Sequence, residues 1–153
     1  MIKYHIQLRN NLQKISFKRK LNFAIQICER IYPEYLKFYE LNDFGNPELL
    51  EKGIDVCRKY EKSKFSEKEI NDLILKIKSV TPDTEDYGEL IGFLALNAAA
   101  SVSEMLKFVL NSNDKHIFDI ANFMFDSVDF QVSDRYPNLN DKEIKWQLQQ
   151  TDN

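Results

Sequence analysis

The residues best suited to chemistry lie in one short segment, ICERIYPEYLKF, at positions 27–38. Cys28, Glu29 and Arg30 place a thiol, a carboxylate and a guanidinium side by side, and nucleophilic and acid–base catalysis use such groups. On a helix, however, adjacent side chains diverge by about 100°. Glu29 and Arg30 therefore cannot pair with each other, and each needs a partner from elsewhere in the chain.

Arg30 has two candidate partners. Glu34 lies four residues on and can be reached if the helix continues through Pro33. Glu104 lies far along the chain, and an Arg30–Glu104 pair would fix the packing of two helices, because a buried charge without its partner is costly. We favour the pair with Glu104. Convergence of Glu29, Arg30 and Glu104 on an open cavity would instead favour an enzyme.

The remaining parts of a catalytic set are missing from the sequence. A nucleophile needs a base beside it, usually histidine, and His5 and His116 are the only histidines in 153 residues. There is no HExxH zinc motif, no GxxxxGK phosphate loop and no GxGxxG turn. Cys28 and Cys57 form no CxxC unit, and we interpret them as buried, reduced thiols. We therefore predict no catalytic residue, no bound metal and no cofactor.

Charge is distributed unevenly, although the net charge is only −3. Residues 1–40 contain eight Lys or Arg and three Glu, whereas residues 79–106 contain five acids and no base. Asp119, Asp126 and Asp129 lie further along the chain and could hold Mg²⁺. A solvated polar helix face is the simpler interpretation of these three aspartates. We predict an acidic surface that suits a basic partner protein. Its residues are Asp83, Glu85, Asp86, Glu89, Asp119, Asp126 and Asp129.

The sequence argues against nucleic acid and membrane as partners. The basic cluster from Lys14 to Lys20 is short and belongs to an acidic protein, so we interpret it as a solvated helix face. No uninterrupted apolar run is long enough to span a membrane, and the N-terminal segment lacks the apolar core of a signal peptide. We therefore expect a cytoplasmic protein.

Apolar residues recur every three or four positions along most of the chain, which predicts helices almost throughout. A short first helix is expected over about 6–15, and Ser16 can cap a second. Pro33 either kinks this second helix or splits it in two. Gly45 suits the left-handed residue after a helix end, and Asn46 followed by proline suits the start of a third helix.

The later helices also carry recognisable ends. Ser66, with Glu three residues on, forms a capping box. The longest helix is expected from about Glu85 to Asn111, and its nearly all-round apolar, Ala-rich surface predicts a place at the centre of a bundle. Asp114 is expected to cap a sixth helix.

A last short helix is expected from Asn140, with Glu143 in the reciprocal capping position. The final few residues are polar and predicted to be frayed. Strand-like alternation, internal repeats and linkers are all lacking. The sequence thus predicts an all-α, single-domain bundle of six to eight helices over residues 1–153.

The opening segment also carries a resemblance to a known family. The pattern CER-x-x-P-x-Y-x-x-F, followed by a Phe-Gly turn, resembles the signature of the bacterial domain of unknown function 416 (DUF416), the YjaG-like proteins. A Ser-Glu step in the Ala-rich helix is similar to that of the family. The resemblance implies an all-helical fold without an established activity or cofactor, in a divergent chain shortened at its C-terminal end. The matching residues, which we interpret as structural, are Cys28, Glu29, Arg30, Pro33, Tyr35, Phe38, Phe44, Gly45, Ser103 and Glu104.

Small size, the acidic region and the missing catalytic set together favour a non-enzymatic protein-binding domain. Its most concrete form is an immunity-type protein that neutralises a basic, nuclease-like bacterial toxin, with acidic side chains standing in for substrate phosphates. Association of the family with signalling suggests an alternative, an adaptor for sensor histidine kinases. A second alternative is an enzyme that uses the Glu29, Arg30 and Glu104 cluster.

Overall fold

The structure, a computed structural model, describes residues 2–153 and contains seven α-helices and no strand over that range. This confirms the predicted all-α bundle of six to eight helices. The helices are α1 (Ile2–Lys14), α2 (Phe17–Asn42), α3 (Pro47–Arg58), α4 (Glu67–Ser79), α5 (Leu90–Asn111), α6 (Asp114–Asp129) and α7 (Leu139–Gln150).

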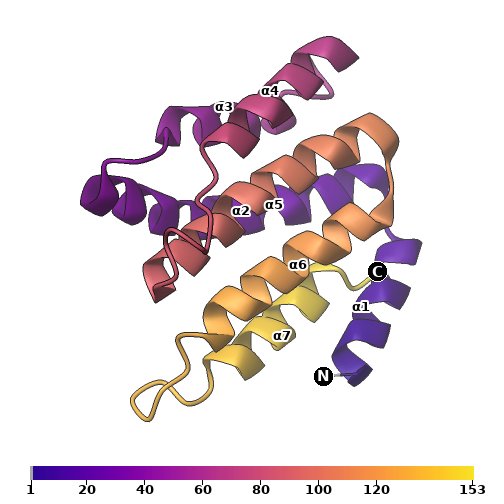
Figure 1. Cartoon of the computed structure of the whole chain (residues 1–153). Helices are drawn as coiled ribbons and strands as arrows, with labels where there is room; N and C mark the ends of the chain where they lie inside the picture. Colours follow the sequence, from indigo (N-terminus) through magenta and orange to yellow (C-terminus); the bar gives the residue numbers. More distant parts are fainter. Residues whose placement is uncertain (1) are drawn as a thin grey trace.

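Helix α5 lies at the centre of the bundle, alongside the long helix α2 (Figure 1). Helices α3 and α4 pack on one side of this pair and α6 on the other, with α7 and α1 beyond α6. Ala98 and Ala99 of α5 are completely buried, and such small side chains let neighbouring helices approach closely. The central, Ala-rich helix is therefore where the sequence predicts it.

Helix α2 is one continuous helix on both sides of Pro33. The proline removes one backbone hydrogen bond, at a cost of about 3 kcal/mol in a helix interior. Ile31 and Tyr35, on either side of it, are almost completely buried, while Pro33 itself is exposed. Packing of the apolar stripe thus outweighs the local cost, and the helix is not split. The helix ends at Asn42, and the residue after it, Asp43, takes a left-handed conformation (φ 51°). Gly45 also has a positive φ (109°), as predicted, but it lies two residues further on.

Helix α5 begins at Leu90, later than the predicted Glu85. The preceding residues form a turn instead, in which Asp83 accepts two local hydrogen bonds. Its carboxylate accepts a hydrogen bond from the N–H of Glu85 (2.8 Å), and its carbonyl accepts one from the N–H of Tyr87 (2.8 Å). Side-chain acceptors of this kind compete with helix formation.

The predicted cap of α6 is wrong by one residue. Asn113 caps the helix, since its side chain accepts a hydrogen bond from the N–H of Lys115 at 2.9 Å. Asp114 lies in the first turn, where it forms an ion pair with Lys20 at 2.8 Å. The carboxylate therefore joins α6 to α2 rather than capping its own helix.

The predicted cap of α7 is also wrong. The helix begins at Leu139, and the side-chain amide of Asn140 donates to Asp129 (3.2 Å) rather than capping α7. Glu143 does not reach back to the helix start, because it is buried and pairs with Arg30.

The C-terminal residues are docked, although the sequence predicts fraying. Thr151 is completely buried, and its hydroxyl accepts a hydrogen bond from Asn11 of α1 at 3.2 Å. The guanidinium of Arg19 donates to the carbonyl oxygens of Gln150 (3.2 Å) and Asp152 (2.7 Å). Contacts with α1 and α2 therefore hold the end of the chain in place.

Helix α5 is also the one helix among residues 2–153 that is long and apolar enough to cross a membrane by length and composition. Most of its apolar window is buried inside the bundle. Burial of this kind is typical of the core helix of a soluble protein.

Candidate functional site

Glu29 and Arg30 point to different neighbours, as their adjacency on a helix requires. Glu29 accepts a hydrogen bond from Arg58 of α3 at 2.7 Å, and both side chains are about half exposed. Arg30 turns toward α7 and pairs with Glu143, with N–O distances of 2.6 and 3.3 Å. The two adjacent residues therefore join α2 to two different helices.

The predicted Arg30–Glu104 pair does not form. Glu104 lies against α6 instead, where one carboxylate oxygen is 2.5 Å from Nδ1 of His116 and the other is 3.2 Å from Lys107. Nε2 of His116 is in turn 3.0 Å from the side-chain amide of Asn111. Glu34, the other candidate partner of Arg30, contacts Lys37 at 3.7 Å. Glu29, Arg30 and Glu104 thus have three separate partners and do not form the common cluster that the enzyme alternative assumes.

Tyr35 explains the phenylalanine–glycine turn of the signature. Its side chain is completely buried, and its hydroxyl donates to the carbonyl of Val80 (2.6 Å) and accepts from the N–H of Asn46 (3.0 Å). Gly45 adopts φ +109°, and a Cβ added there would lie 2.4 Å from that hydroxyl. Glycine is therefore required both by the backbone conformation and by the space that Tyr35 occupies.

The other signature residues pack in or beside the core. Phe38 meets Phe44 and Tyr87 edge-on, with ring centroids 6.2 and 5.0 Å apart. Cys28 is completely buried, and burial, followed by its proximity to Cys57 and Glu29, raises the pKa of its thiol well above the usual value. Ser103 lines a shallow hollow between α4 and α5. Phe38 and Cys28 thus lie in the core, as the structural interpretation of the signature block expects.

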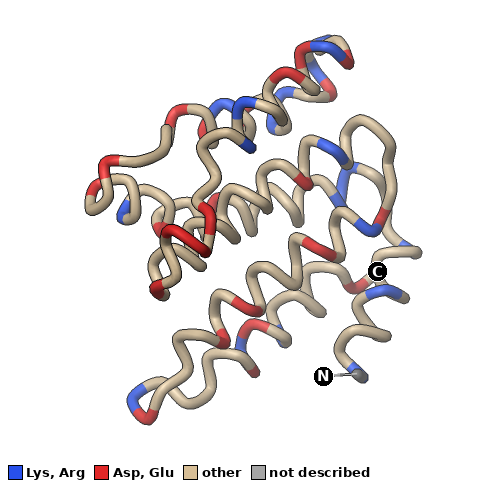
Figure 2. Tube along the Cα trace, viewed as in Figure 1, with Lys and Arg blue, Asp and Glu red and all other residues tan. Residues whose placement is uncertain are grey.

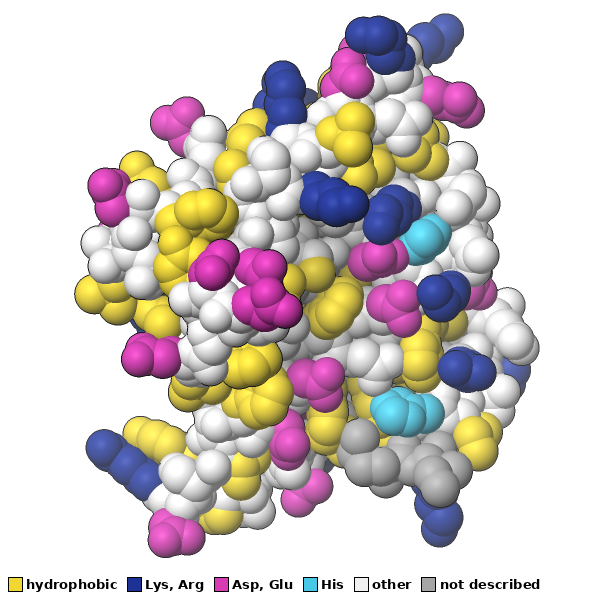
Figure 3. All heavy atoms as spheres, viewed as in Figure 1, with side chains coloured by type: hydrophobic (Ala, Val, Ile, Leu, Met, Phe, Trp, Pro, Cys, Tyr) yellow, Lys and Arg dark blue, Asp and Glu magenta, His cyan; other side chains and the backbone are white. Residues whose placement is uncertain are grey.

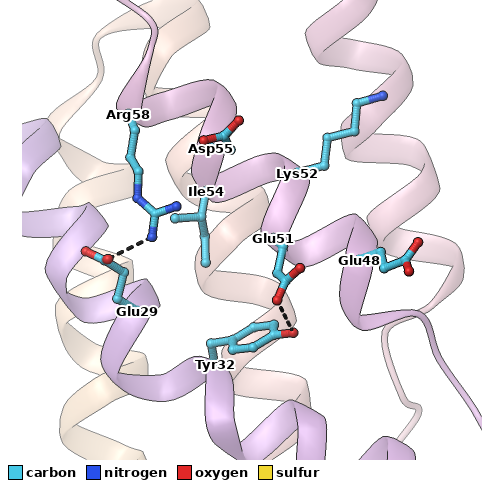
Figure 4. A pocket seen from close by; sticks show the side chains of 8 residues that line it. All are labelled: Glu29, Tyr32, Glu48, Glu51, Lys52, Ile54, Asp55 and Arg58. Atoms are coloured by element: carbon cyan, nitrogen blue, oxygen red, sulfur yellow. Dashed lines mark hydrogen bonds and ion pairs between the residues drawn. The ribbon is translucent and has the colours of Figure 1, made fainter.

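A groove of about 610 Å³ lies between the middle of α2 and α3 (Figure 4). On its α2 side are Glu29 and Tyr32, and the hydroxyl of Tyr32 donates to Glu51 of α3 at 2.9 Å. Burial, then the hydrogen bond and charge of Glu51, raise the pKa of Tyr32 to about 12. The hydroxyl therefore stays protonated at neutral pH. The groove also holds the Glu29–Arg58 pair.

The seven acids predicted to form an acidic surface lie in two places, the α4–α5 connection and helix α6 (Figure 2). All of them are exposed except Asp119, which is partly buried. Within residues 2–153, Asp119 is also the only one of the seven with a cation partner, Lys115 at 3.8 Å. No group of three His, Cys, Asp or Glu in the described chain has a geometry that could hold a metal ion.

Asp126 and Asp129 interact with each other on α6. Partial burial, then the negative charge of Asp129, raise the pKa of Asp126, while His5 lowers it by a smaller amount. Asp126 therefore carries its charge at a free-energy cost in the folded protein. A cation brought to this place by a partner would reduce that cost.

Between the two acidic groups lies an exposed apolar surface that the sequence does not predict (Figure 3). Its centre is a hollow of about 520 Å³, where Leu90 at the start of α5 meets Phe130 at the end of α6 and Tyr136 beyond it. These three side chains are 48%, 52% and 51% exposed, respectively. Phe93, one turn along α5, contacts Phe130 with ring centroids 5.8 Å apart. We call this surface the apolar hollow.

The sequence contains only an indirect signal for the apolar hollow. Phe130 and Tyr136 are large aromatic residues in a polar connection, residues 130–138, that has no helical periodicity. Leu90 fits the apolar face predicted for the central helix, but it lies at the exposed first position of α5. Only the fold of the connection brings the three side chains together.

Comparison with known proteins bears out the resemblance. Residues 7–150 match the family model described as "Protein of unknown function (DUF416)". The uncharacterized protein YjaG of Salmonella typhimurium is 21% identical over 147 residues, which cover 95% of this chain and 74% of that protein. YjaG of Escherichia coli K12 is 20% identical over the same coverage. A crystal structure of a DUF416 family protein from Shewanella baltica has the same fold, with a TM-score of 0.78, 21% identity, and coverage of 93% of this chain and 80% of that one.

Proposed function

The chain belongs to the DUF416 family, and from that premise we propose that it is a non-enzymatic protein-binding domain whose acidic surface receives a basic partner protein. One observation carries the proposal. Six of the seven predicted acids are exposed and lack a cation partner within the described residues, and the seventh, Asp119, has only a distant one. Unpaired like charges repel one another, and a complementary partner removes that repulsion on binding.

The arrangement of the signature residues supports a binding role over a catalytic one. Each charged member has a partner that joins two helices, as in the pairs Glu29–Arg58 and Arg30–Glu143. The tyrosine of the α2–α3 groove has a raised pKa, so the phenolate that could act as a base is scarcely populated at neutral pH. The exposed acids, by contrast, are free to contact another molecule.

The most concrete form of the proposal is an immunity-type protein in the cytoplasm. A nuclease toxin must present basic residues to its substrate, and acidic side chains on a small rigid domain can occupy those residues in place of phosphates. Binding of this kind requires surface complementarity and fast electrostatic association, and it requires no catalytic group.

The proposal is tested by comparing partners of three forms of the full-length protein. Wild type and two charge-neutralised variants are expressed with an affinity tag in the native host, cross-linked, and their partners identified by mass spectrometry. The test variant combines Asp83→Asn, Glu89→Gln, Asp126→Asn and Asp129→Asn. The control removes the same charge from other exposed positions, with Glu40→Gln, Glu61→Gln, Glu67→Gln and Glu69→Gln.

We expect a basic protein to be captured by the wild type and the control and lost by the test variant. A partner set that is identical for all three forms would contradict the proposal. For the immunity form, the same three proteins are co-expressed with the product of the adjacent gene, which this form requires to be a toxin. Wild type and control should then protect the cells, and failure of the wild type to protect them would eliminate this form.

A further inference from the structure

We propose that the apolar hollow anchors the partner, by receiving one large apolar side chain from a basic segment of the partner protein. The acids around the hollow would hold lysine or arginine side chains on either side of that anchor. This inference rests on the proposed function, because it names the part of the acidic surface where the partner docks and the chemistry of the segment that docks there.

The hollow has the form expected of an anchor site. Its walls come from the start of α5 with Leu90, the end of α6 with Phe130, the connection that follows α6, and the beginning of α7 with Leu139. Its volume, about 520 Å³, is large enough for a leucine or aromatic side chain. The core of a protein interface is typically such a pocket, filled by one or two large apolar residues and surrounded by polar groups.

Exposure of these side chains has a free-energy cost that binding would recover. Leu90, Phe130 and Tyr136 are each about half exposed, and they adjoin one another. Exposed apolar area costs about 25 cal/mol per Å² relative to burial. Single exposed apolar residues are common on soluble proteins, whereas a contiguous group with a polar rim marks an interaction site.

The charges at the rim determine which segment fits. Glu89 directly precedes Leu90 in the chain. Asp129 directly precedes Phe130, and Asp126 lies one helical turn before it. Arg135 is the only base in residues 130–139, and its guanidinium lies over the ring of Tyr136 at 5.3 Å, with Asp134 beside it in the chain. Among the charged residues that lie next to the lining residues in the chain or one helical turn away, acids therefore outnumber bases.

An acidic rim around an apolar centre complements a segment with basic residues around an apolar one. Lysine and arginine also carry long aliphatic stems, which can cover the edges of the hollow while their charged ends reach the carboxylates. Nucleic acids and anionic lipid surfaces carry the same charge sign as the rim, so they would be repelled.

The inference is tested on the full-length, ¹⁵N-labelled protein with synthetic peptides as probes. The first peptide carries one leucine between lysines, the second replaces that leucine with serine, and the third replaces the lysines with glutamates. We expect the first peptide to shift the amide resonances of Leu90, Phe93 and Phe130. The serine peptide should bind at least about tenfold more weakly, because the buried leucine is lost, and the glutamate peptide should produce no shift.

Equal binding of the leucine and serine peptides would overturn the inference, since charge alone would then explain the affinity. Shifts confined to another face, or no shift with the first peptide at physiological salt, would also overturn it.

Two substitutions and a matched control then identify the site. Leu90→Ser and Phe130→Ser should each weaken binding of the leucine peptide at least about fivefold. Leu75→Ser, which changes a leucine of α4 that is 64% exposed, should leave binding unchanged. An equal loss in all three variants would contradict the assignment of the site, and circular dichroism checks that each variant is folded.

The same variants separate this inference from the proposed function. One outcome is that the charge-neutralised variant loses the cross-linked partner while Leu90→Ser and Phe130→Ser retain it. In that case the acidic surface binds the partner, and the proposal that the apolar hollow anchors it is wrong. If neither set of changes affects the partner, both proposals fail. Loss of the partner in both sets, with retention in Leu75→Ser, is the expected result.

Discussion

The guanidinium of Arg30 and the carboxylate of Glu143 form a two-bond ion pair between residues 113 positions apart in the chain. Glu143 is almost completely buried, with 2% of its side chain exposed, whereas 38% of the Arg30 side chain is exposed. Trp146 covers the other side of Arg30, with the guanidinium carbon 4.2 Å from the ring centroid. The pair therefore joins α2 to α7 through one charge that water can reach and one that it cannot.

This difference in exposure predicts an asymmetry between two substitutions. Arg30→Leu leaves a buried carboxylate without its cation and should lower the free energy of unfolding by about 2 kcal/mol. Glu143→Gln leaves a guanidinium that water can still solvate, and it should cost about 1 kcal/mol. Urea unfolding followed by circular dichroism measures both values. The double variant should be more stable than the sum of the two losses implies.

The control for this asymmetry is the Glu29–Arg58 pair, in which both side chains are about half exposed. Arg58→Leu should cost less than about 1 kcal/mol, as is usual for ion pairs at the surface. A loss from Arg58→Leu as large as that from Arg30→Leu would show that burial of the carboxylate is not what matters.

A second prediction concerns the contact between Gly45 and Tyr35. Gly45→Ala should lower the free energy of unfolding by about 2 kcal/mol or more, because it combines positive φ with a clash against the buried hydroxyl. Gly88→Ala is the matched control: Gly88 has no positive φ, and an added Cβ would be 3.1 Å from the nearest atom, the carbonyl oxygen of Thr84. Thermal unfolding of the two variants should rank Gly45→Ala clearly below Gly88→Ala, and the reverse order would contradict the geometry.

The two cysteines provide a third prediction. Burial raises the pKa of Cys57 to about 12 and that of Cys28 well above its usual value. Because the thiolate is the reactive form, neither residue should react with a thiol reagent such as DTNB in the native protein at neutral pH. Both should react at once in denaturing urea. Rapid labelling of one thiol in the folded protein would show that the CER segment contains a reactive cysteine after all.

Local features of the fold could be predicted from the sequence because each depends on a few neighbouring residues. The sequence predicts that Ser16 and Ser66 cap helices, and their hydroxyls accept from the N–H groups of Arg19 (3.2 Å) and Glu69 (3.1 Å). The central position of α5 follows from its nearly all-round apolar surface, since only a helix at the bundle centre can bury such a surface.

Contacts between distant segments could not be predicted in the same way. The sequence offers Arg30 many carboxylates, and the choice of Glu143 over Glu104 depends on which face of α7 packs on α2. The apolar hollow also depends on contacts between distant segments, because the path of residues 130–138 brings Tyr136 and Phe130 to Leu90. Periodicity specifies which face of a helix is buried, and it does not specify which helix covers that face.

The last prediction concerns the pH dependence of Asp126. Its pKa is raised in the folded protein, by partial burial and then by Asp129, so the folded state binds a proton there more tightly than the unfolded state does. By linkage, the charged carboxylate destabilises the fold at pH values above its raised pKa, and this penalty disappears as the pH falls below the pKa of the unfolded chain. Asp126→Asn should therefore be at least as stable as wild type at neutral pH, with the difference vanishing in acid.

The titration of Asp126 itself can be followed by its ¹³C carboxyl resonance. The midpoint of this titration should lie above that of an ordinary aspartate and should move down in Asp129→Asn. A midpoint that is unchanged in Asp129→Asn would mean that the two carboxylates do not interact, and that the acidic rim of the apolar hollow lacks the repulsion that a basic partner is proposed to relieve.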